Sequence, residues 1–112
     1  MKLEFGDVVL VRFPFTDQLG AKRRPAVVVS SAHYQQSRPD VILAAVTGNV
    51  SAAAEDLGCP VIEWERAGLY KESAMKPVFF TADRAIVTRV LGRFSAVDKS
   101  ALANMIARAS GP

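Results

Sequence analysis

Short apolar runs rich in β-branched residues recur along this chain, and turn-forming residues bound each of them. Runs of this kind are typical of strands that are buried on both faces. They predict five or six strands, at residues 4–13, 25–30, 41–47, 60–64, 75–81 and 88–94. Pro77 would weaken the fifth strand or place it at a sheet edge, because proline cannot donate to a ladder. Most neighbouring strands lie within hairpin distance, which favours a small antiparallel sheet in meander order.

The segments between these runs are short and mostly polar. Residues 13–20 and 31–40 predict loops, and residues 68–72 predict a turn. Residues 51–56 are compatible with either a helical turn or a loop. Residues 83–87 form a short link of ambiguous structure.

The C-terminal segment predicts one helix. Ser95 precedes Asp98 by three residues, in the manner of a capping box, and a Gly-Pro pair ends the segment. Apolar residues recur every four positions in one stripe, formed by Val97, Ala101, Met105 and Ala109. We expect this stripe to pack on the sheet, and its flanking residues Leu102 and Ile106 to widen the apolar face toward a partner.

Length and composition limit the class of protein further. The chain has 112 residues, which is enough for a single domain. Its longest apolar run, residues 41–46, is far shorter than the roughly 18 residues of a membrane span. Glu4 interrupts the N-terminus before any apolar stretch, so we expect no signal peptide. A lone cysteine, Cys59, cannot form an intramolecular disulfide, and we expect a reducing cytoplasm as the compartment.

The charges are distributed unevenly around a net charge of +3. Residues 1–40 hold six basic and four acidic residues, residues 41–65 hold four acidic residues and no base, and residues 66–112 hold eight basic and three acidic residues. A chain with this distribution can present a basic face to a polyanion. Nucleic acid is therefore one candidate ligand, although chance unevenness is the alternative interpretation.

Two residues at strand ends could bind a phosphate. Arg24 immediately precedes the predicted strand at residues 25–30, which would hold its guanidinium in place for paired donation to phosphate oxygens. Its neighbour Arg23 would point to the opposite face of the strand. Thr47 ends the third predicted strand, where its hydroxyl could donate to an oxygen of the substrate. The alternatives are a solvated basic loop and a threonine chosen for its strand propensity.

Other residues give weaker indications. Phe13 and Phe15 flank a proline near the basic residues 22–24, where exposed rings could stack on unpaired bases. His33 is expected at a solvated surface, and Cys59 is expected to be an unreactive thiol. The remaining large aromatic residues are expected in the core: Trp64, Phe79, Phe80 and Phe94. Motifs for phosphate loops, zinc proteases and serine hydrolases are missing from the sequence, so we expect neither a metal nor a cofactor.

Several sequence blocks occur in an order that resembles the PemK/MazF family of toxins from bacterial toxin–antitoxin systems. The blocks are residues 6–11, 13–17, 22–30, 41–47, 81–84 and 91–95. They extend over nearly the whole chain. The resemblance implies one PemK/MazF-like domain over residues 1–112, mainly β with a C-terminal helix, in the form of a small antiparallel, SH3-like half-open barrel.

The same resemblance implies a metal-independent endoribonuclease, usually a homodimer, that cuts single-stranded RNA at short sequences. In that chemistry the ribose 2′-hydroxyl attacks the adjacent phosphate, which leaves a 2′,3′-cyclic phosphate and a 5′-hydroxyl. The family's catalytic arginine and threonine match Arg24 and Thr47. The residues expected to contact RNA are Phe13, Phe15, Thr16, Asp17, Lys22, Arg23 and Ser31. The expected partner is a cognate antitoxin with an acidic, partly disordered segment that lies along the basic groove.

At one place the chain departs from the family pattern. Several members carry a carboxylate or a glutamine in the strand before the block at residues 81–84, where this chain has Pro77 and Val78. Asp17 or a tyrosine could supply the proton transfer instead. The departure leaves a second hypothesis open, in which the same fold binds nucleic acid or protein without cleaving RNA, or poisons a target such as gyrase.

Overall fold

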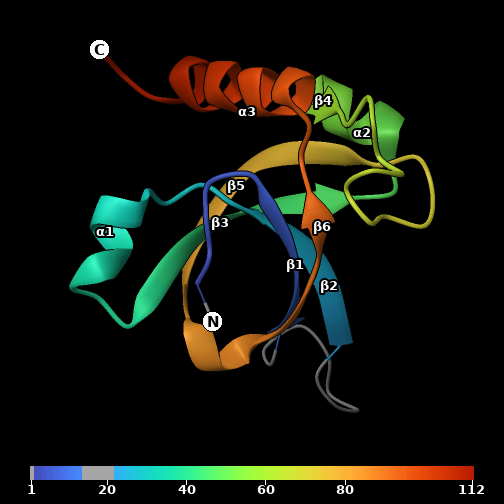
Figure 1. The fold of residues 1–112 in the computed structure, drawn as a ribbon. Coiled ribbons are helices and arrows are strands. Elements are labelled where there is room, and N and C mark those ends of the chain that lie inside the picture. The colour runs from blue at the N-terminus through green and yellow to red at the C-terminus, as the bar shows by residue number, and fades with distance from the viewer. Residues whose placement is uncertain (1, 14–21) are drawn as a thin grey trace.

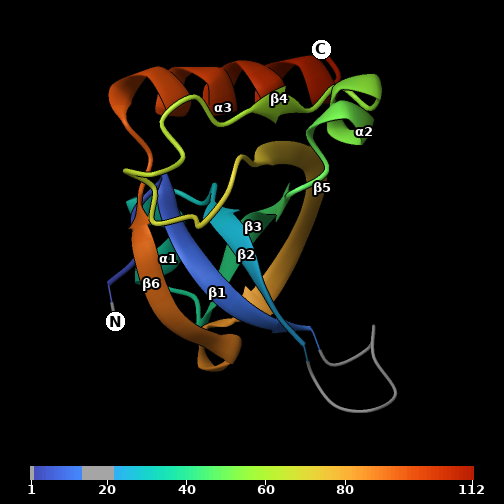
Figure 2. The same cartoon turned by 90° about the vertical axis from the view of Figure 1, so that its right-hand side faces the viewer.

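A curled antiparallel sheet with one long helix across its end makes up the computed structural model (Figures 1 and 2). The structure describes residues 2–13 and 22–112, and only the backbone of Phe13 and Lys22. The predicted loop at residues 13–20 therefore lies almost wholly outside the described residues. The elements are β1 (Asp7–Phe13), β2 (Lys22–Val28), α1 (Ala32–Gln36), β3 (Asp40–Thr47), α2 (Val50–Glu55), β4 (Cys59–Pro60), β5 (Ala74–Asp83), the 3₁₀ turn η1 (Arg84–Ile86), β6 (Val87–Arg93) and α3 (Ala96–Ala109).

The six described strands form one sheet in the order β4-β5-β3-β2-β1-β6, and every pairing is antiparallel. The expected architecture, mainly β with a C-terminal helix, is confirmed. The sheet is open, with β4 and β6 at its two edges. The expected meander order is wrong, because β6 returns to pair with β1 and β5 lies beside β3. Pairing with β6 supplies hydrogen-bond partners to the side of β1 that β2 leaves free.

The apolar runs are continuous because the strands bury both of their faces. On β1, Val9 belongs to a cluster inside the curl of the sheet, whereas Val8 belongs to a cluster that continues under α3. The same division separates Val28 from Val27 on β2. Successive side chains of a strand point to opposite faces, so each β-branched run contributes to two cores at once.

The predicted strand at residues 60–64 is wrong, since β4 ends at Pro60. The backbone N–H groups of Ile62 and Glu63 donate to the Asp98 carboxylate of α3, at 2.8 and 2.9 Å, in place of a neighbouring strand. The other boundaries differ less. The predicted loop at residues 31–40 contains α1, residues 51–56 are largely helical, and the second strand begins at residue 22.

The C-terminal helix begins where it was predicted, and its buried face is shifted from the predicted stripe. Met105 and Ala101 of the stripe pack in the core as predicted, whereas Ile106 packs there instead of toward a partner. The Ser95 hydroxyl accepts a hydrogen bond from the Asp98 N–H, which confirms the cap. Val97 is 57% exposed, whereas Asp98, Leu102 and Met105 are buried. The helix is rotated from the predicted stripe because the Asp98 carboxylate has to reach the amides of residues 62 and 63. Leu102 is therefore in the core of its own chain and is not available to a partner.

Pro77 lies inside a long strand, which neither stops at it nor is weakened into a loop. The pairing of β5 with β3 is irregular here. Met75 and Phe79 of β5 pair with Val46 and Ala44 of β3, so residues 76–78 of β5 lie opposite a single residue of β3. Pro77 thus occupies an irregular stretch, beyond the short reach of β4, where its missing N–H is tolerated. Since β4 pairs only with Ala74 and Met75, the rest of β5 has β3 as its one paired neighbour among the described strands, and the predicted edge position holds for most of β5.

The aromatic residues are only partly in the core. Phe94 is buried, and Trp64 and Phe80 are partly buried against the two clusters. Phe79 is 39% exposed, so its expected place in the core is wrong. No helix among the described residues has the length and apolar character needed to cross a membrane.

Candidate functional site

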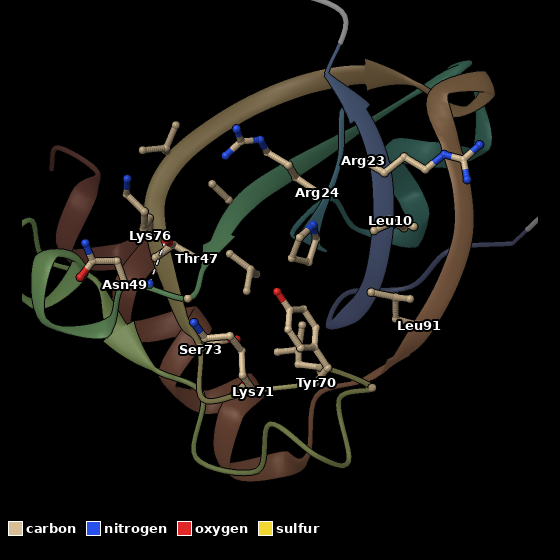
Figure 3. A pocket seen from close by; sticks show the side chains of 17 residues that line it. Leu10, Arg23, Arg24, Thr47, Asn49, Tyr70, Lys71, Ser73, Lys76 and Leu91 are labelled. Atoms are coloured by element: carbon tan, nitrogen blue, oxygen red, sulfur yellow. Dashed lines mark hydrogen bonds between the residues drawn. The ribbon is translucent and has the colours of Figure 1, made fainter. Parts of the chain in front are cut away.

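A groove of about 1040 Å³ opens between β2, the end of β3, the irregular part of β5 and residues 68–73 (Figure 3). Strands β2 and β3 are paired only over residues 26–28 and 43–45, and no pairing joins their remaining ends. Pro25 stands where this pairing stops, and it has no N–H to offer a neighbouring strand. The groove occupies the opening between the unpaired strand ends.

The groove brings together Arg24 and Thr47, the two residues predicted to act on a phosphate. Extending the register of the paired residues by two positions places them opposite each other. Arg24 is exposed, and its guanidinium has no hydrogen bond or ion pair with another described residue. The Thr47 hydroxyl accepts a hydrogen bond from the Asn49 N–H at 3.1 Å, which leaves its own proton free to donate.

Arg23 and Arg24 leave β2 in opposite directions, as strand alternation predicts (Figure 3). Arg24 extends toward the wall that carries Thr47 and Lys76, and Arg23 extends away from it. Arg23 still borders the groove at its rim. Arg24 is therefore the arginine that reaches into the groove.

Two lysines that the sequence reasoning did not single out also line the groove. Lys76 projects from the irregular stretch of β5, together with Val78 two residues later. Lys71 comes from the segment that leads into β5. One signal in the sequence could have revealed Lys76, namely a lysine next to a proline inside an otherwise apolar run.

The Lys71 side chain lies across Gly48, the residue after Thr47. A Cβ atom at Gly48 would come within 2.9 Å of both Cε and Nζ of Lys71. The absence of a side chain at Gly48 is what lets the ammonium group of Lys71 lie beside the end of β3. The sequence does not reveal this role of Gly48, since Lys71 is distant along the chain.

Two long-range contacts hold the segment that carries Lys71. Asp98, which is fully buried, accepts the amide hydrogen bonds at residues 62 and 63. Further along, Gly68 has a φ of +80°, and a Cβ atom there would lie 2.1 Å from the Leu91 carbonyl oxygen. A Cβ atom at Gly92 of β6 would lie 2.5 Å from the carbonyl group of Ala67. Glycine at both positions permits this backbone packing, which fixes the segment against the sheet.

Every charged side chain among the described residues that line the groove is basic: Arg23, Arg24, Lys71 and Lys76. Val78, one of the two residues at which the resemblance led us to expect a carboxylate or glutamine, lines the groove with an apolar side chain. Four cations without a carboxylate among them favour a ligand with several negative charges, such as a nucleic-acid backbone.

Of the remaining residues predicted to contact RNA, the structure describes the side chain of Ser31. Ser31 caps α1, where its hydroxyl accepts the Tyr34 N–H at 3.0 Å, and it does not line the groove. The side chains of five others lie outside the described residues: Phe13, Phe15, Thr16, Asp17 and Lys22. His33 is exposed on α1, as expected.

Neither the thiol nor the carboxylates form a further reactive centre in the described chain. Burial raises the pKa of the Cys59 thiol, and the nearby Asp98 carboxylate raises it further. A raised pKa lowers the fraction of nucleophilic thiolate at neutral pH. Across residues 2–13 and 22–112, no group of three or more His, Cys, Asp or Glu side chains could hold a metal ion.

The sequence model of the PemK-like, MazF-like toxins of type II toxin–antitoxin systems matches residues 4–110. The chain belongs to this family of toxins. No curated protein sequence gives a significant match.

Three solved structures share the fold of the chain. The MazE-MazF complex of Deinococcus radiodurans superposes with a TM-score of 0.74 at 18% identity, over 96% of this chain and 95% of that one. An endoribonuclease in complex with its cognate antitoxin from Mycobacterial species gives 0.72 at 14% identity, over 99% and 98%. The Mycobacterium tuberculosis toxin MazF-mt6 gives 0.70 at 19% identity, over 92% and 94%. At these identities the likeness establishes the fold.

Proposed function

We propose that the groove cleaves single-stranded RNA at short sequences, without a metal ion, as the toxin of a type II toxin–antitoxin pair. The observation that carries the proposal is the placement of Arg24 opposite Thr47 in a groove whose described charged residues are all basic. Membership of the toxin family and the endoribonuclease named among the structural neighbours support the same reaction.

In the proposed reaction the RNA supplies its own nucleophile. The 2′-oxygen forms a bond to the adjacent phosphorus while the bond from phosphorus to the 5′-oxygen breaks. The products are a 2′,3′-cyclic phosphate and a 5′-hydroxyl, and DNA is excluded because it has no 2′-hydroxyl. Negative charge grows on the phosphorane oxygens, where the Arg24 guanidinium and the Thr47 hydroxyl would donate hydrogen bonds.

The described residues that line the groove include no carboxylate. Of the two proton-transfer candidates, Asp17 lies outside the described residues, and Tyr70 is a tyrosine that lines the groove. The ammonium groups of Lys71 and Lys76, which also line the groove, would be available to donate a proton to the departing 5′-oxygen. They would also neutralise the phosphates on either side of the reacting one.

The same basic groove is the proposed docking surface for the antitoxin. An acidic, partly disordered segment of the antitoxin would lie along it and compete with RNA for Arg24 and the two lysines. One structural neighbour is an endoribonuclease in complex with its cognate antitoxin, and another is MazE-MazF. We further propose that the chain forms a homodimer. Sedimentation at micromolar concentration, which measures the molecular mass in solution, tests this. A mass near the 12.1 kDa of one chain would contradict it.

One observation favours a second candidate function. Val78 stands where a carboxylate or glutamine is expected, so the groove could bind RNA or protein without cutting RNA. A cleavage assay on a defined pool of single-stranded RNA in EDTA separates the two functions. We expect cuts at a short sequence, and 5′ ends that a kinase labels without prior phosphatase treatment. RNA that is bound but stays whole would favour the binding module, and ends that resist direct labelling would contradict the 2′-hydroxyl attack.

A further inference from the structure

Tyr70 stands at the wall of the groove as an exposed aromatic side chain. It is 89% exposed, more than any other large apolar or aromatic side chain that the structure describes. Its hydroxyl has no hydrogen-bond partner among the described residues. Figure 3 shows its ring between Lys71 and Leu91, with the hydroxyl directed into the groove. Neither packing nor hydrogen bonding within the described chain accounts for a tyrosine in this place.

The backbone on both sides of Tyr70 is held firmly. Before it, Leu69 is buried and its N–H donates to the Trp64 carbonyl oxygen at 3.1 Å. After it, Ser73 is buried, and its hydroxyl donates to the Lys71 carbonyl oxygen at 3.0 Å. The fold thus fixes the backbone here while leaving two adjacent side chains free for a ligand. Binding to such a site loses little conformational entropy.

From this placement we infer that Tyr70 is a base-stacking residue, which holds the base of a nucleotide whose phosphate is bound by Lys71. The inference rests on the proposed RNA function and names a residue that determines which RNA is accepted. Aromatic rings beside basic side chains are the usual means by which proteins hold unpaired nucleotides. A base inside a duplex is already stacked on both faces, so Tyr70 would select unpaired RNA.

The test is a binding measurement on the full chain with a short single-stranded RNA pool. Methylation of every 2′-oxygen blocks the attack, and 2-aminopurine in the strand reports stacking by its fluorescence. We compare Tyr70→Ala, which removes the ring, with Tyr70→Phe, which keeps the ring and removes the hydroxyl. Ile62→Ala is the matched control, because Ile62 is 62% exposed and does not line the groove.

We expect Tyr70→Ala to bind roughly 5- to 150-fold more weakly, the range for stacking aromatics, and to lose the fluorescence quenching. Tyr70→Phe and Ile62→Ala should bind and quench like the wild-type chain. Thermal unfolding should be unchanged in all three variants, since both side chains are exposed. Wild-type affinity and quenching in Tyr70→Ala would overturn the stacking inference and leave the proposed function intact. If the wild-type chain binds no single-stranded RNA, the stacking inference and the proposed function are both contradicted.

Discussion

Arg24 of β2 and Thr47, the last residue of β3, line the same groove, and the register of the two strands, extended two positions beyond their last pair, sets them opposite each other. The strands separate before they reach these residues, so the space between the two side chains is open to a ligand. In the proposed function, the Arg24 guanidinium from one strand and the Thr47 hydroxyl from the other would donate to the same phosphate. This geometry depends on where the pairing of β2 with β3 ends. The amino-acid sequence does not show that position.

Replacing Arg24 with alanine should reduce the rate of RNA cleavage by roughly 10²–10³, the typical effect of losing one donor to a developing oxyanion. The fold should be unaffected, because the Arg24 side chain is exposed. Arg89→Ala is the matched control, since Arg89 is exposed on β6 and lies outside the groove. A single-turnover cleavage assay compares the two variants. Equal rates for Arg24→Ala and the wild-type chain would remove Arg24 from the reaction.

Gly48→Ala should displace Lys71 without unfolding the chain. The added methyl group would lie 2.9 Å from Lys71 Cε and Nζ, at the far end of a flexible side chain that can move away. Loss of one phosphate contact makes the plot of log K against log salt less steep, by roughly 0.7 in slope for single strands. RNA titrations at several salt concentrations should show that decrease, and Lys71→Ala should match it. Gly111→Ala serves as the control, because a Cβ there meets nothing within 4 Å, and an unchanged slope for Gly48→Ala would contradict the contact.

Asp98→Ala should destabilise the fold and loosen the segment before Tyr70. It would remove an acceptor that is buried and bound to two backbone N–H groups, which are then left unsatisfied. We expect the free energy of unfolding to fall by about 2–4 kcal/mol. Chemical denaturation measures this, with Glu72→Ala at an exposed acidic position as the control. A loss no larger than that of the control would show that water replaces the Asp98 hydrogen bonds at little cost.

The Arg38 guanidinium, which donates to Asp40 at 2.9 Å, holds the pKa of the Asp40 carboxyl below its usual value of 3.8, and the Tyr34 hydroxyl adds to the effect. A lowered pKa in the folded state means that ionised Asp40 stabilises the fold at neutral pH. This contribution should disappear as the pH falls below 3.8 and through the folded pKa. The wild-type chain should therefore be slightly more stable than Asp40→Asn at pH 7, with the difference vanishing in acid. Unfolding curves across this range measure it, and a difference that grows in acid would contradict the assignment.

Local patterns in the sequence were sufficient for most elements of the fold. The β-branched runs around Val9, Val28 and Leu43 identified three strands, and the Ser95 cap identified the start of the last helix. The predicted strand after Pro60 failed because the amides there bind a carboxylate of α3 instead of a strand. That carboxylate also rotated the helix away from its predicted stripe. Both errors have one cause, which is a single buried hydrogen-bonding group far away in sequence.

For the site, the sequence alone determined the residue types and their local setting. It places an arginine near the start of one strand and a threonine at the end of another, in a chain with more basic than acidic residues. Tertiary structure decided which of these residues meet. Lys71 reaches the end of β3 only because Gly48 lacks a side chain, and Tyr70 borders the groove only because Gly68 packs against β6. Contacts of this kind join segments that are distant along the chain. Their geometry depends on strand register and on backbone packing, and neither produces a repeating pattern of residues in the sequence.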